Sequence, residues 1–454
     1  MHHMHATPSD CVRLINISDR GAHKQMRRHL RRLSTRLSAR GRTLASGGGQ
    51  AAAVWESVNA LAAQPGMVNM GQGYPDFPGS SIARRVAAEA AASAESSLAQ
   101  YTPQPGSLRL RRAVSQFYAE RYGASYDPAD EVVVTAGGQE SLAAAFLAYL
   151  DPGDEVVLFE PFYPFMLGAV HLAGAIPRVV RLNAPDFEID HAALEAACAS
   201  PRAKMVVLNS PHNPTGHVAT AAELALVARL CARHDLLALS DEVYEHAVFD
   251  GTHRRLADEP GMRERTITVS SGGKLFSLTG WRVAWACGPA ALVGPLGRAH
   301  THLTFSAPTP LQEGIAAALE AETAGAGAAG VGASEAEAGS LGAIAPLFRA
   351  NFEALSAALR DGTAVRSVCA AQGGYFLVAE TDGRSDVDFC TALARDKGVV
   401  CTPMSVFYAS AFDEAAPCTL VRFTICKSAE HIARACAALR APPRSGSGTT
   451  PGCD

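Results

Sequence analysis

The segment SSGGKLFSLTGWR, residues 270–282, contains one of only five lysines in this chain of 454 residues. A lysine after an apolar run is usually a solvated surface residue, but the neighbours of Lys274 indicate chemistry. Gly272 and Gly273 would let the backbone approach a ligand closely. A lysine amine that adds to a carbonyl group benefits from partial burial and cationic neighbours, because both lower its pKa. Groups suited to a phosphate also lie nearby in the sequence, at Ser270, Ser271 and Arg282.

A second pattern suited to a phosphate is TAGGQESL, residues 135–142. Glycines between a strand and a helix would leave free N–H groups at the start of the helix, where the helix dipole stabilises a phosphate. The same glycines could also form an ordinary turn. A reactive lysine together with a phosphate site predicts a phosphate ester that carries an aldehyde, and pyridoxal phosphate is the obvious compound of this kind.

Asp241 and Arg422 are two further charged residues in apolar surroundings. Asp241, in LLALSDEVYEH, could cap a helix, or it could keep the ring nitrogen of the cofactor protonated so that the ring accepts electrons. Tyr244 and Asn213 could hydrogen-bond the phenolic oxygen of the same ring. Arg422, in LVRFTICK, needs a partner inside an apolar strand, and a substrate carboxylate would match its planar guanidinium.

The elements that must position these residues follow a regular alternation after about residue 50. Short apolar runs, each followed by a helical stretch, predict strands at 132–135, 156–159, 205–209, 236–239 and 266–270. This alternation predicts an α/β fold in which a mostly parallel sheet is covered by helices on both faces. The polar motifs of this part of the chain follow the carboxyl ends of these strands, where open α/β sheets bind ligands.

Composition divides the chain into five predicted parts. Residues 51–320 are expected to form an N-terminal arm and the large cofactor-binding domain. Residues 347–441 are expected to form a smaller α/β domain, with strands at 376–379 and 421–425 and helices at 388–397 and 430–440. The Ala-, Gly- and Ser-rich residues 321–346 predict a flexible surface insertion. Residues 1–50 and 442–454 are expected to be disordered.

Charge and cysteine usage exclude several classes of protein. A net charge of −4 and a pI near 6.4 do not fit a nucleic-acid-binding protein, which is usually basic. Because no run of about 18 apolar residues occurs, no membrane span is predicted. The cysteines, 11 in all, show no Cys-x-x-Cys and no paired spacing with histidine. Reduced thiols are therefore expected, and no metal site.

The first 50 residues differ in charge from the rest of the chain. No acidic residue lies between Gly21 and Trp55, although eight lysines and arginines fall there. Apolar residues recur in this stretch at helical spacing, at Met26, Leu30, Leu33 and Leu37. A basic, hydroxyl-rich and acid-poor segment is typical of an organellar transit peptide. It predicts a mitochondrial or chloroplast protein, with a disordered basic tail of a cytoplasmic protein as the alternative.

The motifs NPTG, DEVY, SSGGK…TGWR and VRF, in this order and spacing, resemble class I pyridoxal-phosphate aminotransferases of fold type I. The resemblance covers roughly residues 52–440. Longer strings, such as VNMGQGYPDFP, QYTPQPG, EPFYPF and PMSVFY, look most like the kynurenine aminotransferases, also called glutamine transaminase K or cysteine-S-conjugate β-lyase. This resemblance implies transfer of an amino group from kynurenine, glutamine or another large neutral or aromatic amino acid to a 2-oxo acid. Kynurenine–oxoglutarate transamination is the reaction it favours most.

The resemblance also implies roles in cofactor binding. Lys274 would bond covalently to pyridoxal phosphate and then move the proton between the substrate Cα and the cofactor. Asp241 would pair with the ring nitrogen, and Asn213 and Tyr244 with the phenolic oxygen. The remaining cofactor contacts would be stacking by Tyr163 and phosphate binding by Gly138, Gln139, Ser271 and Arg282.

For the substrate, the resemblance implies that Arg422 binds the α-carboxylate. The pocket for the substrate side chain would be formed by Trp55, Gly73, Asn213 and Phe305. Tyr101 would reach the phosphate bound to the other subunit, which implies a homodimer with shared active sites.

Two positions depart from the kynurenine branch and leave the choice of amino acid open. Gln139 stands where an aromatic residue is expected, and Ser306 follows Phe305 where a histidine is expected. The strings SPHNPTG and WACGPA also look like bacterial N-succinyldiaminopimelate aminotransferases. That activity and methionine transamination are alternatives, as is C–S lyase chemistry on the same scaffold. A cofactor-binding regulator would need a DNA-binding domain, for which the N-terminal segment is too short.

Overall fold

The computed structural model of this chain describes residues 37–38, 41–42, 49–325, 340–409, 412 and 416–444. The chain divides into two units, residues 1–48 and residues 49–454. Most of the predicted transit segment, and residues 445–454 of the predicted tail, lie outside the described residues. Both predictions therefore stay predictions.

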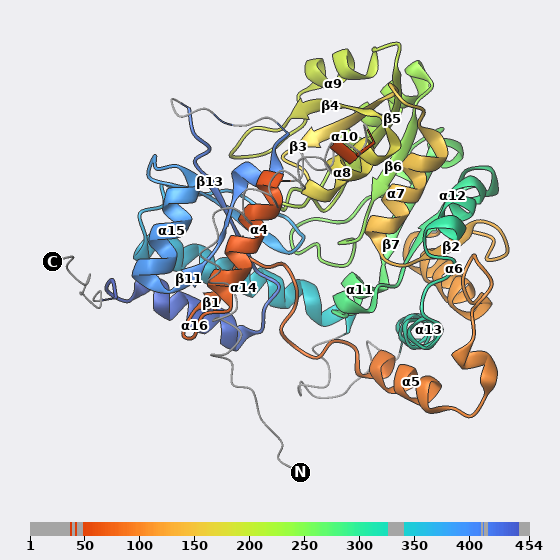
Figure 1. Ribbon diagram of the computed structural model, residues 1–454, viewed down its shortest axis with the longest axis horizontal. Coiled ribbons are helices and arrows are strands. Elements are labelled where there is room, and N and C mark those ends of the chain that lie inside the picture. The colour runs from red at the N-terminus through yellow and green to blue at the C-terminus, as the bar shows by residue number, and fades with distance from the viewer. Residues whose placement is uncertain are drawn as a thin grey trace, which may run out of the picture. The chain divides into compact units, whose positions relative to one another are not determined.

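Seven strands form the main sheet of the second unit, in the order β2-β8-β7-β6-β5-β3-β4 (Figure 1). Their bounds are β2 Val132–Thr135, β3 Glu155–Glu160, β4 Ile176–Arg181, β5 Ala203–Asn209, β6 Leu237–Asp241, β7 Thr266–Ser271 and β8 Ala284–Cys287. Only β8 runs antiparallel to its neighbours, β2 and β7. The six parallel strands therefore end at one edge of the sheet. The predicted mostly parallel α/β sheet is confirmed, and β4 and β8 join the strands expected from sequence.

Helices cover both faces of this sheet because alternate residues of its strands point to opposite sides. Val156 and Leu158 of β3 pack in one core cluster with helices α7, α8 and α12, which span Gly138–Tyr149, Pro164–Ala173 and Ala290–Leu303. Val157 and Phe159 pack on the other face with α9 and α10, which span His191–Cys198 and Ala221–His234. Strands buried on both faces explain the continuous apolar runs in the sequence.

A third core cluster lies at the β2 edge of the sheet. Val132 and Val134 of β2 and Trp285 of β8 pack there against α6 and α13. These helices span Leu108–Tyr122 and Thr309–Thr323, and α5, Ser81–Ala92, lies against α13. The sheet is thereby enclosed by helices that come from both before and after it in the sequence.

The C-terminal residues form a separate antiparallel sheet in the order β12-β13-β10-β9. These strands are β9 Ser367–Val368, β10 Phe376–Glu380, β12 Thr402–Pro403 and β13 Leu420–Thr424. Helices α14, α15 and α16 pack on it and span Leu341–Gly362, Asp386–Lys397 and Ala429–Arg440. Each predicted strand and helix of this region is present, within two residues of its expected bounds.

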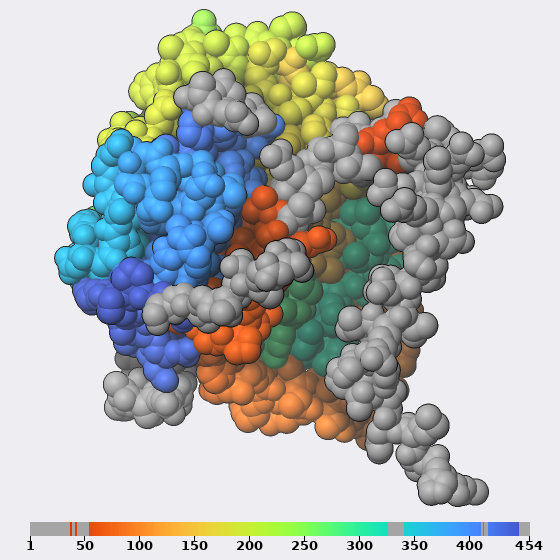
Figure 2. Space-filling view, turned by 60° about the vertical axis from the view of Figure 1, so that its left-hand side comes forward, coloured from red at the N-terminus to blue at the C-terminus, as the bar shows by residue number. Residues whose placement is uncertain are grey.

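The first described residues of this unit contact the C-terminal part of the chain. Strand β1, Val68–Asn69, pairs in parallel with β11, Val399–Val400. Helix α4, Gly49–Ala62, contacts β11 and the 3₁₀ turn η7, Met404–Phe407. Figure 2 shows this orange N-terminal region lying against the blue C-terminal residues. The segment that follows β1 is thus held by the C-terminal part of the chain.

The predicted insertion at 321–346 overlaps the end of α13 and the start of α14, and its residues 326–339 lie outside the described residues. The domain boundaries proposed from composition therefore stay predictions. Across the described ranges, no helix is both long and apolar enough to cross a membrane.

Candidate active site

The parallel strands bring the predicted cofactor residues to one edge of the main sheet. Lys274 lies in the short helix α11, Gly272–Leu275, directly after β7, and Asp241 is the last residue of β6. Asn213 follows β5, Tyr163 follows β3 and caps α8, and Gly138 begins α7 after β2. Residues that are far apart in sequence therefore meet, because the carboxyl ends of neighbouring parallel strands lie side by side.

Lys274 is partly buried between two aromatic rings. Its Nζ lies 5.3 Å from the ring centroid of Tyr244 and 5.1 Å from that of Tyr375. The hydroxyl of Tyr375 donates a hydrogen bond of 2.8 Å to the backbone carbonyl oxygen of Lys274. Burial lowers the pKa of Lys274 to about 8, and the charges of Arg282 and Arg422 act in the same direction. Near neutral pH this amine is thus more often uncharged than that of an exposed lysine, as a nucleophile requires.

Asp241 is a buried carboxylate without a cation in contact with it. Burial raises its pKa to about 7, although Lys274 acts to lower it. Its only hydrogen bond in the described part of the chain is a long one of 3.4 Å from the Val243 backbone N–H to Oδ1. Residues 243–246 form a turn and no helix starts there, so the helix-cap interpretation is wrong. A protonated ring nitrogen would give this carboxylate the partner it lacks.

Asn209, which the sequence motifs did not single out, positions two of the predicted residues. Its Nδ2 donates to the backbone oxygen of Asp241 at 2.9 Å, and its Oδ1 accepts from the backbone N–H of Asn213 at 2.8 Å. The side chain thereby joins the ends of β5 and β6. In the sequence, the only indication of this positioning role is an asparagine at the end of an apolar run.

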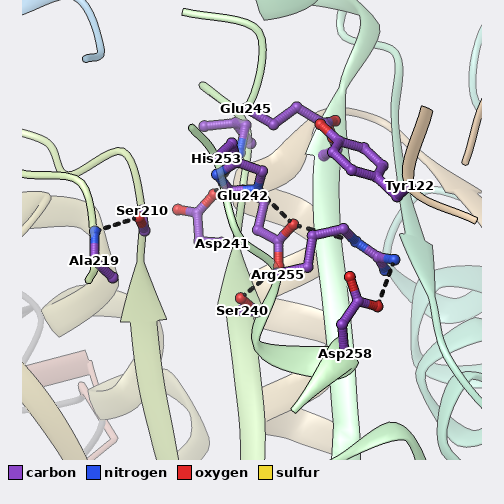
Figure 3. Close-up of polar contacts among 12 residues, drawn as sticks. Tyr122, Ser210, Ala219, Ser240, Asp241, Glu242, Glu245, His253, Arg255 and Asp258 are labelled. Carbon is purple, nitrogen blue, oxygen red and sulfur yellow. Dashed lines mark hydrogen bonds and ion pairs between the residues drawn. The ribbon is translucent and has the colours of Figure 1, made fainter. Parts of the chain in front are cut away.

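Behind Asp241 lies a buried network of charges, shown in Figure 3. The carboxylate of Glu242 points away from that of Asp241 and contacts His253 at 3.0 Å and Arg255 at 3.6 Å. Ser240 donates to the same carboxylate at 2.8 Å. Arg255 thus places a positive charge next to Glu242 inside this buried network. The network fixes the end of β6 on which Asp241 stands.

The predicted phosphate site lies at the start of α7, and it depends on Gly137, the first of the two glycines in TAGGQESL. Gly137 has φ of 99°, and a Cβ there would come within 2.3 Å of Arg282 Nη2. The Arg282 guanidinium thus lies against the N-terminal turn of α7, which contains Gly138 and the exposed Gln139. A helix N-terminus with an adjacent guanidinium suits a phosphate.

The two serines before Lys274 differ in their contacts. The hydroxyl of Ser271 makes only a long bond of 3.4 Å to the Val283 carbonyl oxygen, so it can donate to a ligand instead. The hydroxyl of Ser270 donates to Glu245 Oε1. The expectation that Ser270 serves a phosphate is therefore wrong, because successive strand residues point to opposite faces.

Arg422 is a fully buried cation at the junction of the two sheets. It donates to Asn213 Oδ1 and to the Gly71 carbonyl oxygen, both at 3.0 Å. Its Nε has no partner among the described residues. Burial lowers the pKa of Arg422 to about 9. In the described part of the chain no carboxylate contacts this guanidinium, so the site lacks an anion that a substrate could supply.

Aromatic rings surround Arg422. Its Cζ lies 3.9 Å from the ring centroid of Phe376, 4.5 Å from Phe407 and 5.5 Å from Trp55. A Cβ at Gly73 would lie 2.3 Å from the Phe376 ring, so only glycine fits at that position. The indole Nε1 of Trp55 is buried and has no partner among the described residues. The structure thus brings Gly73, Trp55 and Arg422 together, and their roles toward a substrate stay predictions.

Tyr101 and Phe305 are placed differently from the other predicted residues. Tyr101 is 78% exposed and Phe305 is 42% exposed, and their ring centroids lie 5.0 Å apart. The structure thus brings these two side chains to each other at the surface. Their roles toward a second subunit and toward the substrate stay predictions.

Known proteins resemble this chain over most of its length. Residues 65–439 match the family described as aminotransferase class I and II. This chain belongs to that family. It is 40% identical over 390 residues to a probable N-succinyldiaminopimelate aminotransferase of Mycobacterium tuberculosis, covering 83% of this chain and 92% of the relative. A kynurenine–oxoglutarate transaminase of Dictyostelium discoideum is 32% identical, with 82% and 90% covered.

Solved structures agree with this assignment. The structure of N-succinyldiaminopimelate aminotransferase from Mycobacterium tuberculosis matches with a TM-score of 0.78 and 38% identity, covering 89% of this chain and 99% of that one. A methionine aminotransferase from Escherichia coli matches with a TM-score of 0.76 and 33% identity, covering 85% and 96%. The fold is therefore fold type I, and the cofactor of this aminotransferase is pyridoxal 5′-phosphate.

The residues present fit that cofactor. A lysine of lowered pKa, a buried carboxyl without a cation, and a helix N-terminus beside a guanidinium stand at one sheet edge. These are the groups that an aldehyde, a ring nitrogen and a phosphate require.

Gly137→Ala tests the phosphate site. An alanine at this φ is strained by about 1–3 kcal/mol, and its Cβ would displace the Arg282 guanidinium. We expect the dissociation constant for pyridoxal phosphate to rise at least about tenfold, measured by absorbance titration of the apoenzyme.

Gly153→Ala is the matched control, because Gly153 has a similar φ of 95° and no other atom lies within 4 Å of the place its Cβ would take. It should lose stability without losing cofactor affinity. Equal cofactor affinities in the two variants would mean that the phosphate binds elsewhere.

Asp241→Asn should make the apoenzyme more stable at pH 8 while lowering the activity of the enzyme. The carboxyl has a pKa of about 7 in the folded chain against an ordinary 3.8. The folded state therefore holds this proton more tightly, and apoenzyme stability falls as the pH rises through that interval. The asparagine variant avoids this loss, so its apoenzyme should melt at a higher temperature than wild type at pH 8.

Transamination by the same variant should fall by several orders of magnitude, because an amide does not keep the ring nitrogen protonated. Asp250→Asn, at an exposed position, is the control and should change neither property. Near-normal turnover in Asp241→Asn would remove Asp241 from the mechanism.

Proposed function

We propose that this aminotransferase moves the amino group of kynurenine, glutamine or another large neutral or aromatic amino acid to a 2-oxo acid. The observation that supports this proposal is the aromatic surround of Arg422. The guanidinium would bind the α-carboxylate common to all amino acids, while Phe376, Phe407 and Trp55 make the adjoining walls apolar. Such walls favour an apolar substrate side chain over a charged one. Kynurenine–oxoglutarate transamination is the leading reaction.

The proposed roles follow from the positions of the side chains. When bound, pyridoxal phosphate supplies an aldehyde that bonds to amines and a ring that accepts electrons. Lys274 Nζ, with its lowered pKa, would take the proton from the substrate Cα and deliver it to the cofactor carbon. Asp241 would hold a negative charge beside the ring nitrogen. Asn213, already bonded to Arg422, would lie between the carboxylate site and the cofactor ring.

Cofactor contacts by Tyr163 and Tyr244 complete this proposal. Burial raises the pKa of Tyr163 to about 12 and the pKa of Tyr244 well above its ordinary value. Both hydroxyls therefore stay protonated at neutral pH and can donate hydrogen bonds.

Two alternatives rest on the relatives, which include a probable N-succinyldiaminopimelate aminotransferase and a methionine aminotransferase, and C–S lyase chemistry is a third alternative. A succinylated substrate carries further carboxylates and would need a second cation in the pocket. A C–S lyase would use the same removal of the Cα proton but would expel a sulfur leaving group.

We further propose a homodimer, in which exposed Tyr101 reaches the partner's site, and an organellar location directed by residues 1–50.

A panel of amino donors with 2-oxoglutarate tests the proposed substrate class. We expect kynurenine, glutamine and phenylalanine to give higher kcat/KM than aspartate or N-succinyldiaminopimelate, because the walls beside Arg422 are apolar. Arg422→Ala should raise KM for all donors and acceptors by about a hundredfold, since losing one partner of a buried pair costs about 2–5 kcal/mol.

Arg181→Ala is the matched control for this variant. Arg181 also stacks on two rings, Tyr408 and Phe412, but it is exposed, so its loss should leave KM unchanged. Selective loss of one donor class in Arg422→Ala would show that Arg422 reads a side-chain carboxylate. A preference for the succinylated donor, or pyruvate and ammonia as the main products from β-substituted substrates, would favour the corresponding alternative.

Deleting residues 1–48 tests the proposed location. The second unit begins at Gly49, so the truncated enzyme should keep its kcat and KM in vitro. In its own cell a fluorescent fusion of the truncated chain should stay in the cytosol, whereas the full-length fusion should enter an organelle. Cytosolic full-length protein would contradict the transit interpretation.

A further inference from the structure

Two thiols of the C-terminal part of the chain lie in contact with each other, next to residues that hold Arg422. Cys390 stands on α15, and Cys401 lies between β11 and β12. Their Sγ atoms are 3.2 Å apart. Nine cysteines fall within the described residues, all of them free, and Cys390 is the only one of these nine that is not fully buried. The pair therefore combines close contact with partial exposure of one of the two residues.

We propose that Cys390 and Cys401 form a reversible disulfide, and that this oxidation weakens substrate binding at Arg422. A disulfide has an S–S distance of about 2.05 Å, so the two sulfur atoms must approach by roughly one ångström more. No other residue has to be moved from between them. The second half of the proposal rests on the proposed role of Arg422 in binding the substrate carboxylate.

The reaction needs an external two-electron oxidant, and its balance is simple. Each thiol loses one hydrogen, the two sulfur atoms bond, and two electrons and two protons pass to the oxidant. A low-molecular-weight disulfide would be reduced to two thiols, and the azo compound diamide to a hydrazine. Exchange begins at the more accessible sulfur, which is that of Cys390.

Burial sets how readily the pair reacts. It raises the pKa of the Cys390 thiol well above its ordinary value, with the neighbouring Cys401 acting in the same direction. Because the thiolate is the reactive form, the pair should stay reduced in a reducing compartment. It should oxidise only under sustained oxidant, as expected for a sensor and not for a permanent structural disulfide.

Cys401 is joined to the substrate site through both of its neighbours in the chain. Thr402 Oγ1 donates to the Gly71 carbonyl oxygen at 2.9 Å, the same oxygen that accepts from Arg422 Nη2 at 3.0 Å. Thr402 is also the residue of β12 that pairs with Arg422 of β13. On the other side, the Val400 carbonyl oxygen accepts from the Met70 N–H at 2.8 Å.

Movement of Cys401 toward α15 would therefore pull on the hydrogen bonds that hold Gly71 and Arg422 together. Loss of one such bond is worth about 1 kcal/mol, which corresponds to about a fivefold change in an equilibrium constant. Lys274 and Asp241 stand on the other sheet, so the covalent attachment of the cofactor should be unaffected.

The experiment treats the reduced holoenzyme with diamide, blocks remaining thiols with N-ethylmaleimide, and maps peptides by mass spectrometry. We expect one cross-linked peptide pair containing Cys390 and Cys401, with two hydrogens lost. KM for the amino donor should rise about fivefold, the visible spectrum of the bound cofactor should not change, and dithiothreitol should reverse both effects.

Cys390→Ser and Cys401→Ser should each abolish the cross-link and the response of KM to diamide. Cys436→Ser, a buried cysteine of the same region, should keep both. Absence of the cross-link in wild type, or a link through another cysteine, would overturn the site. A cross-link that leaves KM unchanged would overturn its connection to Arg422. If the reduced enzyme accepts no amino donor, the proposed function fails, while the peptide map still decides the disulfide.

Discussion

The buried guanidinium of Arg422 is the interaction on which the arrangement of this active site depends. It joins a loop after β5 of the main sheet, through Asn213, to the segment after β1, through Gly71. A buried cation without an anion is costly, and here the cost is reduced by two hydrogen bonds and three aromatic rings. The arrangement makes the site ready for a carboxylate, because an anion would relieve the remaining cost of burying the charge.

Lys274 and Asp241 are also charged groups whose burial is not fully balanced by contacts with the protein. Lys274 is partly buried and Asp241 is buried, and the pKa of each is shifted toward the neutral form, whereas Glu242 contacts both His253 and Arg255. Two carboxylates adjacent in sequence thus have different surroundings: Glu242 is held by side chains of the fold, and Asp241 is left for a ligand. Perturbed pKa values at a sheet edge are typical of functional sites for this reason.

The proposed substrate pocket and the cofactor site are built on different parts of the chain. Gly73 and Trp55 belong to the N-terminal segment and Phe376 to the C-terminal sheet, whereas Asp241 ends β6 of the main sheet and Lys274 directly follows β7. Chemistry and specificity therefore rest on different segments, and Arg422 with Asn213 is where they meet. This separation explains how one scaffold can serve relatives with different amino donors.

The sequence by itself determined the fold class, the strand order along the chain and the identity of the chemical groups. Apolar runs ending in SPHNPTG, SDEVYEH and SSGGK were sufficient, because parallel strands buried on both faces leave a clear pattern and each motif follows one of them. Strands β4 and β8 went unpredicted: β4 is a partly exposed edge strand that lacks this pattern, whereas β8 is a short apolar run, buried throughout, that the prediction missed.

Tertiary structure alone decided which neighbours compensate which charges. In the sequence Ser270 and Ser271 are equivalent, but the pleat of the strand directs Ser270 toward Glu245. The sequence also allows Asp241 to cap a helix, but the structure has a turn after it. Gly137 matters only because the guanidinium of Arg282, 145 positions away, lies where its Cβ would be. Cys390 and Cys401 meet only because α15 packs beside β11 and β12. Such contacts depend on how the segments pack, so they cannot be predicted from local residue patterns.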